Sequence, residues 1–355
     1  MRRRRFLLSA LALALSDARA GVSYPRVVRG VPLQFPRDYG SHPDFRTEWW
    51  YVTGIAVEQS GTQFGVQITF FRTRPGIAED LTSRFAPRQL LFAHVALALP
   101  ERGSLITDQR AARTGFGLAD AAEQTTDIHI DDWTLALHGD VYAARIAARD
   151  FALSLEFHIA QPPMLQGENG VSRKGPRDTE ASYYYSVPQL RMSGNVDADG
   201  RTRSAAGIAW LDHEWSSTYL APDAVGWDWT GINFDDGGAL MAFRIRDRAG
   251  NPLWSGGAFR DAQQRQTAFD RSSVRFETLR TWRSSRTNIE YPVSMRVTAG
   301  DIDLVLEPLF DDQENDARAT VGTVYWEGAV HARRDGARIG RGYLELTGYG
   351  EPLKL

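Results

Sequence analysis

Hydrophobic and polar residues alternate with a period of two along much of the chain. The clearest case is the segment 151–159, FALSLEFHI, in which every second residue is Phe, Leu or Ile. Successive side chains of a strand point to opposite faces, so this pattern predicts a strand with one buried face. A similar alternation or a strand-like apolar composition occurs at 48–57, 65–71, 89–99, 239–245, 302–306, 323–332 and 341–349.

Turn residues separate these segments, and long stretches of helical periodicity are absent. The sequences at 236–237 and 249–251 are typical of tight turns between antiparallel strands. Many short strands joined by glycine-rich turns are typical of β-sandwiches and β-barrels. The pattern therefore predicts an all-β protein.

A short motif occurs twice, about half the chain apart. Residues 50–55 and 227–232 share the pattern W-x-x-T-G-I, and each is followed by a turn and an apolar strand. Self-similarity of this kind suggests a duplicated β-domain, the alternative being a chance match of six residues. We expect two tandem antiparallel β-barrel domains, the first formed by residues 21–217 and the second by 218–355.

The first twenty residues have the features of an export signal. Arg2–Arg5 are basic, Phe6–Ser16 are mostly apolar, and residues 18–20 form an A-x-A cleavage site. Residues 3–7 also fit the twin-arginine pattern R-R-x-F-L, the alternative being an ordinary Sec signal. We expect residues 1–20 to be removed and the mature protein to be exported, either periplasmic or secreted.

Composition and missing motifs exclude several classes of protein. No later stretch reaches the roughly 18 apolar residues of a membrane span. The 355 residues include 41 basic and 44 acidic ones, a balance that argues against nucleic-acid binding. The absence of cysteine excludes disulfides and thiolate sites. Without an H-E-x-x-H, G-x-S-x-G or dinucleotide-binding motif, we expect no metal ion and no cofactor.

Acidic and aromatic residues are concentrated in Trp210–Trp215 and Gly226–Trp229, which hold four of the ten tryptophans. Asp212, His213 and Asp228 are interleaved with these rings. An aromatic wall removes water from a carboxylic acid and raises its pKa, and ring faces stabilise a cation. This combination suits protonation of an alkene and capture of the resulting carbocation. The alternative is that the tryptophans fill barrel cores and the charged groups form buried hydrogen bonds.

Two further segments place polar residues near aromatic ones. Residues 162–175 form a loop rich in proline and glycine, which is either a lid over a barrel mouth or a plain surface connection. The strand after it contains Tyr184, which should point away from its two tyrosine neighbours. His42, Asp44 and Glu48 could hold a metal ion, but a charged plug at a barrel end is the favoured interpretation.

Seven segments spread over about residues 40–350 match the motifs of a known family. They are 48–54, 64–72, the loop 166–175, 181–186, 210–215, 226–229 and 342–349. Together they resemble the carotenoid 1,2-hydratases (hydroxyneurosporene synthases) and the AttH-type lipocalin-like secreted proteins. These motifs are specific for the family and much less specific for one reaction within it.

The resemblance implies two lipocalin-like β-barrel domains with an apolar ligand site near their junction. Carotenoid hydratases of this family add water across a terminal double bond of an acyclic carotenoid without a redox cofactor. Carried onto this chain, Asp228 or Asp212 would be the acid that protonates the double bond. His213 would orient this acid or activate the water molecule.

The resemblance also implies an aromatic ligand site. Trp215 and Trp227 would flank the cation, and Trp229, Tyr184 and Trp50 complete the predicted binding set. Many family members are exported proteins considered alongside ABC-transport components. Two functions therefore compete: a hydratase acting on an apolar, isoprenoid-type ligand, and a non-catalytic carrier of such a ligand that works with an ABC-type transport system. Convergence of the acids and the histidine on one cavity would favour the hydratase.

Overall fold

The computed structural model describes residues 22–58, 60–77 and 79–353. Within these ranges the chain forms 23 β-strands and a short 3-10 helix, η1 (Arg37–Tyr39). The export signal predicted for residues 1–20 lies outside the described residues. A search of the described ranges finds no helix that is long and apolar enough to cross a membrane.

The first sheet is antiparallel and has 13 strands. They are β1 (Thr47–Val57), β2 (Gln63–Thr73), β3 (Leu90–Leu99), β4 (Ser104–Arg113), β5 (Ala119–Ala121), β6 (Asp127–Ile130), β7 (Trp133–His138), β8 (Val141–Ala147), β9 (Phe151–His158), β10 (Met164–Leu165), β11 (Val171–Arg173), β12 (Ala181–Ala198) and β13 (Arg201–Thr218). Their main order is β4-β3-β2-β1-β13-β12-β9-β8-β7-β6-β5, with β10 and β11 paired to β12. The predicted alternation in β9 is confirmed, since every second residue from Phe151 is buried.

The second sheet is also antiparallel and has 10 strands. They are β14 (Ala224–Phe234), β15 (Ala239–Asp247), β16 (Pro252–Arg260), β17 (Gln266–Phe269), β18 (Val274–Arg283), β19 (Glu290–Ala299), β20 (Ile302–Pro308), β21 (Glu314–Ala317), β22 (Thr323–Arg334) and β23 (Ala337–Leu346). Their main order is β17-β16-β15-β14-β23-β22-β20-β19-β18, with β21 paired to β22.

The repeated W-x-x-T-G-I motif occupies the corresponding strand of each sheet. It lies in β1, which pairs with β2 and with the last strand of the first sheet, β13. Its second copy lies in β14, which pairs with β15 and with the last strand of the second sheet, β23. The two sheets therefore share their connectivity around this strand. The predicted fold class, all-β with two lipocalin-like barrels, is confirmed.

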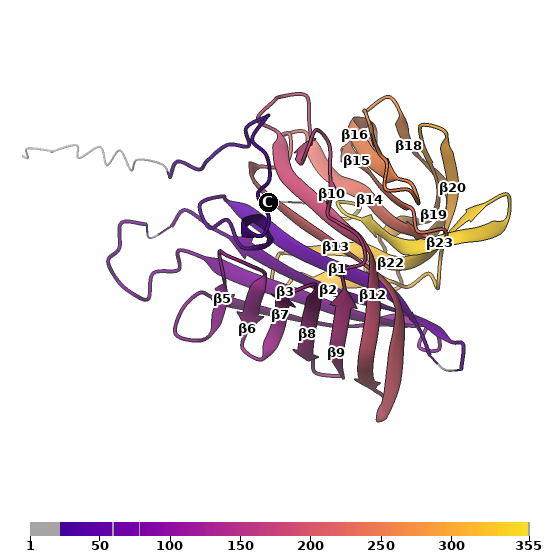
Figure 1. The fold of residues 1–355 in the computed structure, drawn as a ribbon, viewed down its shortest axis with the longest axis horizontal. Coiled ribbons are helices and arrows are strands. Elements are labelled where there is room, and N and C mark those ends of the chain that lie inside the picture. Colours follow the sequence, from indigo (N-terminus) through magenta and orange to yellow (C-terminus); the bar gives the residue numbers. More distant parts are fainter. Residues whose placement is uncertain (1–21, 59, 78, 354–355) are drawn as a thin grey trace, which may run out of the picture.

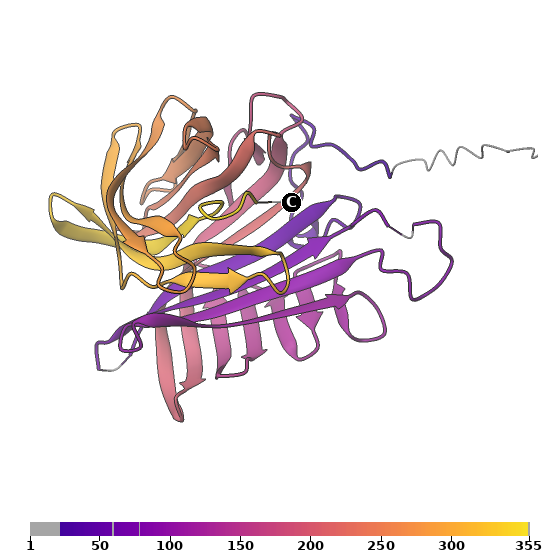
Figure 2. The same cartoon turned by 180° about the vertical axis from the view of Figure 1, so that it is seen from behind.

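Each sheet encloses an apolar core, and a third apolar cluster joins the two sheets. This joining cluster includes Tyr51, Tyr184, Trp210, Trp229 and Phe243. Contacts of β1 with β23, of β2 with β22 and of β13 with β14 bring the sheets together at this point. Figures 1 and 2 show the purple-to-magenta sheet packed against the orange-to-yellow one along these strands.

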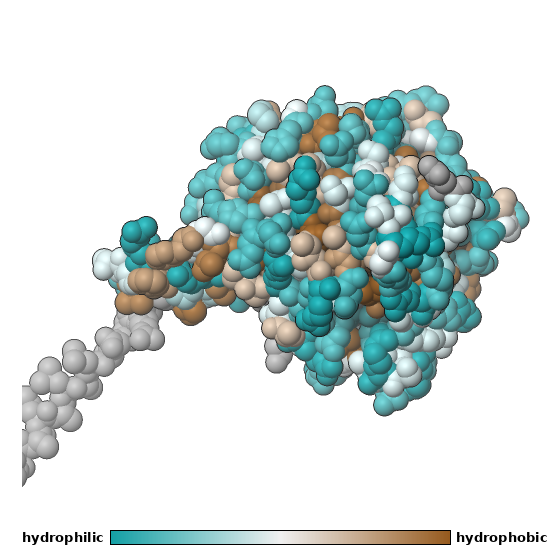
Figure 3. Space-filling model, turned by 90° about the horizontal axis from the view of Figure 1, so that it is seen from below, coloured by the Kyte–Doolittle hydropathy of each residue, from teal (hydrophilic) through white to brown (hydrophobic). Residues whose placement is uncertain are grey.

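The outer surface contrasts with this apolar junction. The face shown in Figure 3 is mainly hydrophilic, and its apolar residues form smaller patches among polar ones. The largest fully buried side chains, by contrast, include Trp50, Trp133, Trp210, Trp215 and Trp326. Most of the large aromatic surface of the protein is therefore inside the sheets or between them.

Candidate active site

Strand alternation sends neighbouring residues of the acidic and aromatic motifs to opposite faces. In β13, Asp212 faces the second sheet, whereas His213 points into the first barrel and contacts its core. In β14, Trp227 and Trp229 face the first sheet, whereas Asp228 lies on the opposite side of the strand. The residues of these motifs therefore lie in three separate places: between the two sheets, inside the first barrel, and on the side of β14 that faces away from the first sheet.

A small chamber of about 90 Å³ lies between the two sheets. Its walls come from β1, β2, β12, β13, β14, β15, β22 and β23, and they combine aromatic rings with ionisable groups. The acidic and basic side chains that line it are Lys174, Asp212, Glu214, Glu327 and Glu345. Four carboxyl groups and one ammonium group thus line one small, largely buried space.

Four residues of the predicted site meet in this chamber: Tyr184, Asp212, Trp227 and Trp229. They come from β12, β13 and β14, so both sheets contribute. Trp227 donates a hydrogen bond from Nε1 to Glu345 at 2.9 Å. The structure therefore brings part of the predicted acid and aromatic set together at the junction of the sheets.

Asp212 is buried in the chamber wall. One carboxylate oxygen accepts a hydrogen bond from the Tyr184 hydroxyl at 2.7 Å, and the other accepts from Ser186 and from Trp210 Nε1. The Tyr184 oxygen in turn accepts from Trp229 Nε1 at 3.0 Å. Burial raises the pKa of Asp212 to about 7, outweighing the three donors, which lower it. At neutral pH the carboxyl is present in both forms, as a general acid must be.

Lys174 provides the one lysine or arginine side chain among the described residues that line the chamber. Its ammonium group pairs with Glu214 at 2.8 Å and lies 4.3 Å from the centre of the Phe243 ring. The Tyr219 hydroxyl also donates to Glu214, at 3.3 Å. Burial lowers the pKa of Lys174, and the charge of Glu214 opposes this effect. Because Lys174 is committed to Glu214, the other chamber carboxyls have no ion-pair partner among the described residues.

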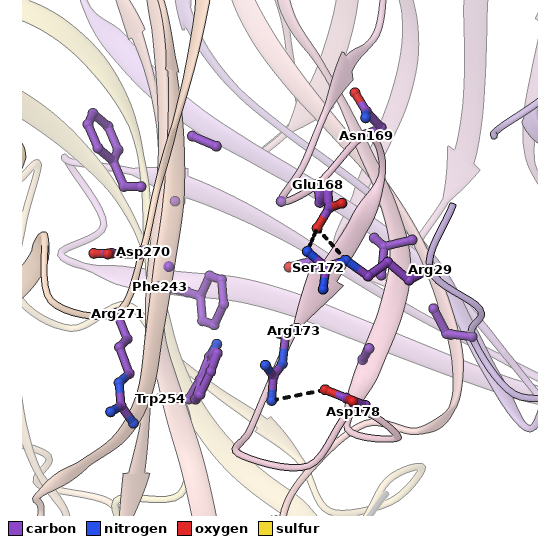
Figure 4. Close-up of a pocket in the computed structure, with 18 of the residues that line it drawn as sticks. Arg29, Glu168, Asn169, Ser172, Arg173, Asp178, Phe243, Trp254, Asp270 and Arg271 are labelled. Carbon is purple, nitrogen blue, oxygen red and sulfur yellow. Dashed lines mark hydrogen bonds and ion pairs between the residues drawn. The ribbon is translucent and has the colours of Figure 1, made fainter. Parts of the chain in front are cut away.

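A larger, open groove of about 970 Å³ runs between the two sheets, and Figure 4 shows the residues along it. The loop at 162–175 contributes one wall, and residues of β15 and β16 contribute the other. The guanidinium groups of Arg173 and Arg271 lie 4.6 and 5.7 Å from the centre of the Trp254 ring. Phe243 lines both the groove and the chamber, so its ring lies in the wall between them.

Asp228 lies outside the chamber, although both of its neighbours in β14 line it. Its buried carboxylate pairs with Arg244 Nε at 2.8 Å and with Arg246 Nε at 3.0 Å. It also accepts a hydrogen bond from the Tyr349 hydroxyl at 2.8 Å. Arg244 donates to the carbonyl of Phe276, a core residue of the second barrel. The structure thus separates Asp228 from Asp212 and places it in an ion cluster.

His213, Trp50 and Trp215 lie in the first barrel rather than in the chamber. The His213 ring stacks on Trp50 with ring centres 4.5 Å apart, and its Nε2 lies 2.9 Å from a Glu48 oxygen. Trp215 stacks on His42 with ring centres 3.7 Å apart. Burial lowers the pKa of His213 to about 4, so its imidazole is neutral at pH 7. These side chains pack around Glu48, away from the chamber.

One group of described residues, His42, Glu48 and His213, brings its potential ligand atoms within 4.8 Å of one another, close enough to hold a metal ion. The Glu48 oxygens already interact with both histidine rings and accept a hydrogen bond from Arg72 Nε at 2.7 Å. These interactions occupy the carboxylate, so the group forms a hydrogen-bonded charge cluster. Asp44, predicted beside it, is instead exposed and lies 3.7 Å from Arg74.

The sequence motifs did not identify Glu327 and Glu345 as site residues. Both lie in predicted strands, but a glutamate in an apolar strand often belongs to a solvated face. A signal was present, because Tyr325 and Tyr343 each precede a glutamate by two residues and so share its face. Only the pairing of β22 with β23 brings the two glutamates together.

Replacing Asp228 with Asn should destabilise the fold, because Arg244 and Arg246 would lose their shared carboxylate while remaining mostly buried. We expect the free energy of unfolding, measured by urea denaturation, to fall by about 3–5 kcal/mol. The matched variant Asp303→Asn changes an exposed pair with Arg296. It should alter stability by less than about 0.5 kcal/mol. Equal effects of the two substitutions would contradict the structural role of Asp228.

Asp212 should make stability decline between about pH 4 and pH 7. Its folded pKa of about 7 exceeds the unfolded value near 3.9, so the unfolded carboxyl loses its proton first. The contribution of Asp212 is therefore fully present at low pH and is lost as the pH rises through the folded pKa. Asp212→Asn should reduce the decline by a few kcal/mol in unfolding experiments at a series of pH values. Identical pH profiles of variant and wild type would show that folding does not raise the pKa of Asp212.

Comparisons with known proteins agree with the fold and with the sequence motifs. The AttH-like family model matches residues 26–349. The crystal structure of an AttH protein from Nitrosomonas europaea is 50% identical, covers 92% of this chain and 99% of its own, and has a TM-score of 0.86. Among proteins with curated descriptions, none matches the sequence significantly.

Two solved structures of low identity share the fold. Kievitone hydratase from Nectria haematococca is 12% identical, covers 92% of this chain and 96% of its own, and has a TM-score of 0.69. The structure of CghA with Sch210972 is 11% identical, covers 87% of this chain and 89% of its own, and has a TM-score of 0.54. At such identity the likeness shows the fold alone. The match along nearly the whole described chain, together with the 50% identical structure, shows that this protein belongs to the AttH-like family.

Proposed function

We propose that this protein is a cofactor-free hydratase that adds water across a double bond of an apolar, isoprenoid-type ligand, with Asp212 as the proton donor. The observation that carries the proposal is the environment of this carboxyl. It is buried, has a pKa of about 7 and lines a chamber walled by tyrosine and tryptophan. A buried acid with such a pKa can release a proton at neutral pH without help from a metal or cofactor.

The aromatic walls suit the cation that protonation would create. Trp227 and Trp229 lie in the same chamber as the acid, and Tyr51 packs against Trp229 with ring centres 5.3 Å apart. The electron-rich faces of such rings attract positive charge, and the attraction grows when water is excluded. Tyr184 donates to Asp212 and thereby holds the carboxyl in place. The chamber therefore combines a proton source with a surface that stabilises a carbocation.

The groove and the chamber together suit an elongated apolar ligand. The groove of about 970 Å³ presents Met241, Phe243 and Trp254, whereas the chamber of about 90 Å³ holds only the reacting end of such a molecule. In the proposal, the chain of the ligand lies in the groove and its terminal double bond passes Phe243 into the chamber. Sites that bind apolar ligands commonly pair an apolar wall with a few placed polar groups.

The proposed reaction involves no net oxidation. Asp212 transfers a proton to one alkene carbon, a tertiary cation forms at the other carbon, and the oxygen of a water molecule attacks this cation. The attacking water then loses a proton to a base. The fold is compatible with this chemistry, since kievitone hydratase shares it. The export signal predicted for residues 1–20 would place this reaction outside the cytoplasm.

Asp212→Asn should strongly slow hydration while leaving the ligand bound. The purified protein would be incubated with neurosporene, an acyclic carotenoid, in isotopically labelled water, and the product detected by mass spectrometry. We expect the wild type to incorporate one labelled hydroxyl group. The variant should turn over about 10²–10⁴-fold more slowly, because a general acid contributes about this factor.

The control is Asp303→Asn, which removes the same kind of carboxyl from an exposed strand position. It should hydrate neurosporene as the wild type does. Turnover by Asp212→Asn at the wild-type rate would contradict the proposed acid. Binding of neurosporene by the wild type without any product would instead favour a non-catalytic carrier.

A further inference from the structure

Two glutamates lie directly opposite one another in the second sheet. Glu327 of β22 pairs in register with Glu345 of β23, and both line the chamber. Side chains directly opposite on antiparallel strands have Cβ atoms about 4.5–5.5 Å apart. Like charges at such positions destabilise a sheet even at the surface. Here Glu327 is buried and Glu345 is partly buried, so the cost of two negative charges would be larger than at the surface.

The surroundings of this pair provide little compensation. Glu345 accepts a hydrogen bond from Trp227 Nε1 at 2.9 Å, but Oε1 of Glu327 has no hydrogen-bond partner among the described residues. Within the same part of the chain, the hydroxyl of Tyr51, a further chamber residue, also lacks a partner. Lys174 is the one lysine or arginine among the described residues that line the chamber, and its ammonium group is paired with Glu214. An unpartnered buried carboxylate oxygen is costly, and a bound proton reduces that cost.

The carboxyl groups that face the pair favour its protonated form. From β13, the charges of Asp212 and Glu214 raise the pKa of Glu345 in addition to the effect of burial. Burial first, and then the charge of Glu345, raises the pKa of Glu327 well above its usual range. From β22, the Tyr325 hydroxyl is engaged by Asn315 Nδ2 at 3.0 Å. Burial and the facing carboxyl charges therefore oppose ionisation of both glutamates. They outweigh the nearby donors Tyr51, Tyr325 and Trp227, which lower the pKa values of the pair.

We propose that Glu327 and Glu345 share one proton at neutral pH and that this pair is the base that accepts the proton of the attacking water. This inference rests on the proposed hydratase function and assigns its second half-reaction. The pair comes from the second sheet, whereas the acid Asp212 comes from the first. A double bond held between the sheets therefore has a proton donor on one wall and a proton acceptor on the other.

The protons and electrons of this cycle balance. The π electrons of the alkene form a C–H bond with the Asp212 proton, and a lone pair of water forms the C–O bond. The protonated hydroxyl group then gives its proton to the ionised carboxylate of the pair. Asp212 is left as a carboxylate and the pair holds two protons. Transfer of one proton through water from the pair to Asp212 restores the starting state.

Infrared spectroscopy tests whether the proton is shared. The carboxylic-acid band of the wild type would be followed as a function of pH and compared with Glu327→Gln and Glu345→Gln. Removing either glutamate removes the like charge that holds the last proton. The midpoint at which the band of the remaining glutamate disappears should therefore fall by about 1 pH unit or more in either variant. An unchanged midpoint in both variants would overturn the shared proton.

The role of the base is tested by turnover of neurosporene. Either glutamine variant should bind neurosporene as the wild type does and hydrate it about 10²-fold or more slowly. The acidic limb of the pH–rate profile should also shift, because it reports ionisation of the pair. Glu307→Gln, which alters an exposed ion pair with Arg333, is the matched control and should behave as the wild type.

The outcomes separate this inference from the proposed function. Wild-type hydration that persists at full rate in both glutamine variants, while Asp212→Asn is inactive, would overturn the pair as the base and leave the acid in place. Absence of hydration by the wild type would contradict the proposed function and remove the catalytic role of the pair with it. In that case the infrared titration would still decide whether the proton is shared.

Discussion

Four carboxyl groups and one ammonium group are enclosed between two β-sheets, and this imbalance of charge constrains the chemistry of the site. Ionisation of all four carboxyls would leave uncompensated charge in a largely buried space, which costs far more than at a surface. Lys174 satisfies Glu214, so protons must balance the remaining charge. The elevated pKa of Asp212 is one consequence of this arrangement. We therefore propose that the junction between the two sheets keeps some of its carboxyl groups protonated near neutral pH.

The two ion clusters inside the barrels provide a contrast. Asp228 is held by two arginines, and Glu48 by Arg72 and two histidines, so their charges are compensated within the structure. Breaking such a cluster costs stability. Its cations favour the ionised form of the carboxylate, so the carboxylate does not readily take up a proton. Apart from Glu214, which pairs with Lys174, the chamber carboxyls have no such cationic partner among the described residues. This difference is why we propose a catalytic role for the carboxyls between the barrels and a structural role for those inside them.

The sequence predicts the fold well because the information is local. Alternation along β9, and the W-x-x-T-G-I motif in β1 and β14, follow from the period of the strand and need no long-range contact. Asp212 and Tyr184 were also identifiable, since an acid among aromatic rings is unusual in any strand. The same alternation implies that the adjacent residues Asp212 and His213 point to opposite faces of β13, and the structure shows that they do.

The remainder of the site depends on partners that are distant in sequence. The sequence suggests that Asp228 is a catalytic acid, but the pairing of β14 with β15 places Arg244 and Arg246 against its carboxylate. The sequence does not mark Glu327 and Glu345 as a pair, because they become neighbours only when β22 and β23 pair in register. Each of these roles is decided by which strands become neighbours and by the side chains that then surround a carboxyl. A motif read along one segment does not contain that information.

The most direct test of this account is to locate the protons of the chamber by neutron diffraction from crystals grown in heavy water slightly below neutral pH. We expect deuterium on the Asp212 carboxyl and a single deuteron within the Glu327–Glu345 pair, with Glu214 ionised beside Lys174. Four carboxylates without deuterium would contradict the claim that the chamber stores protons for catalysis.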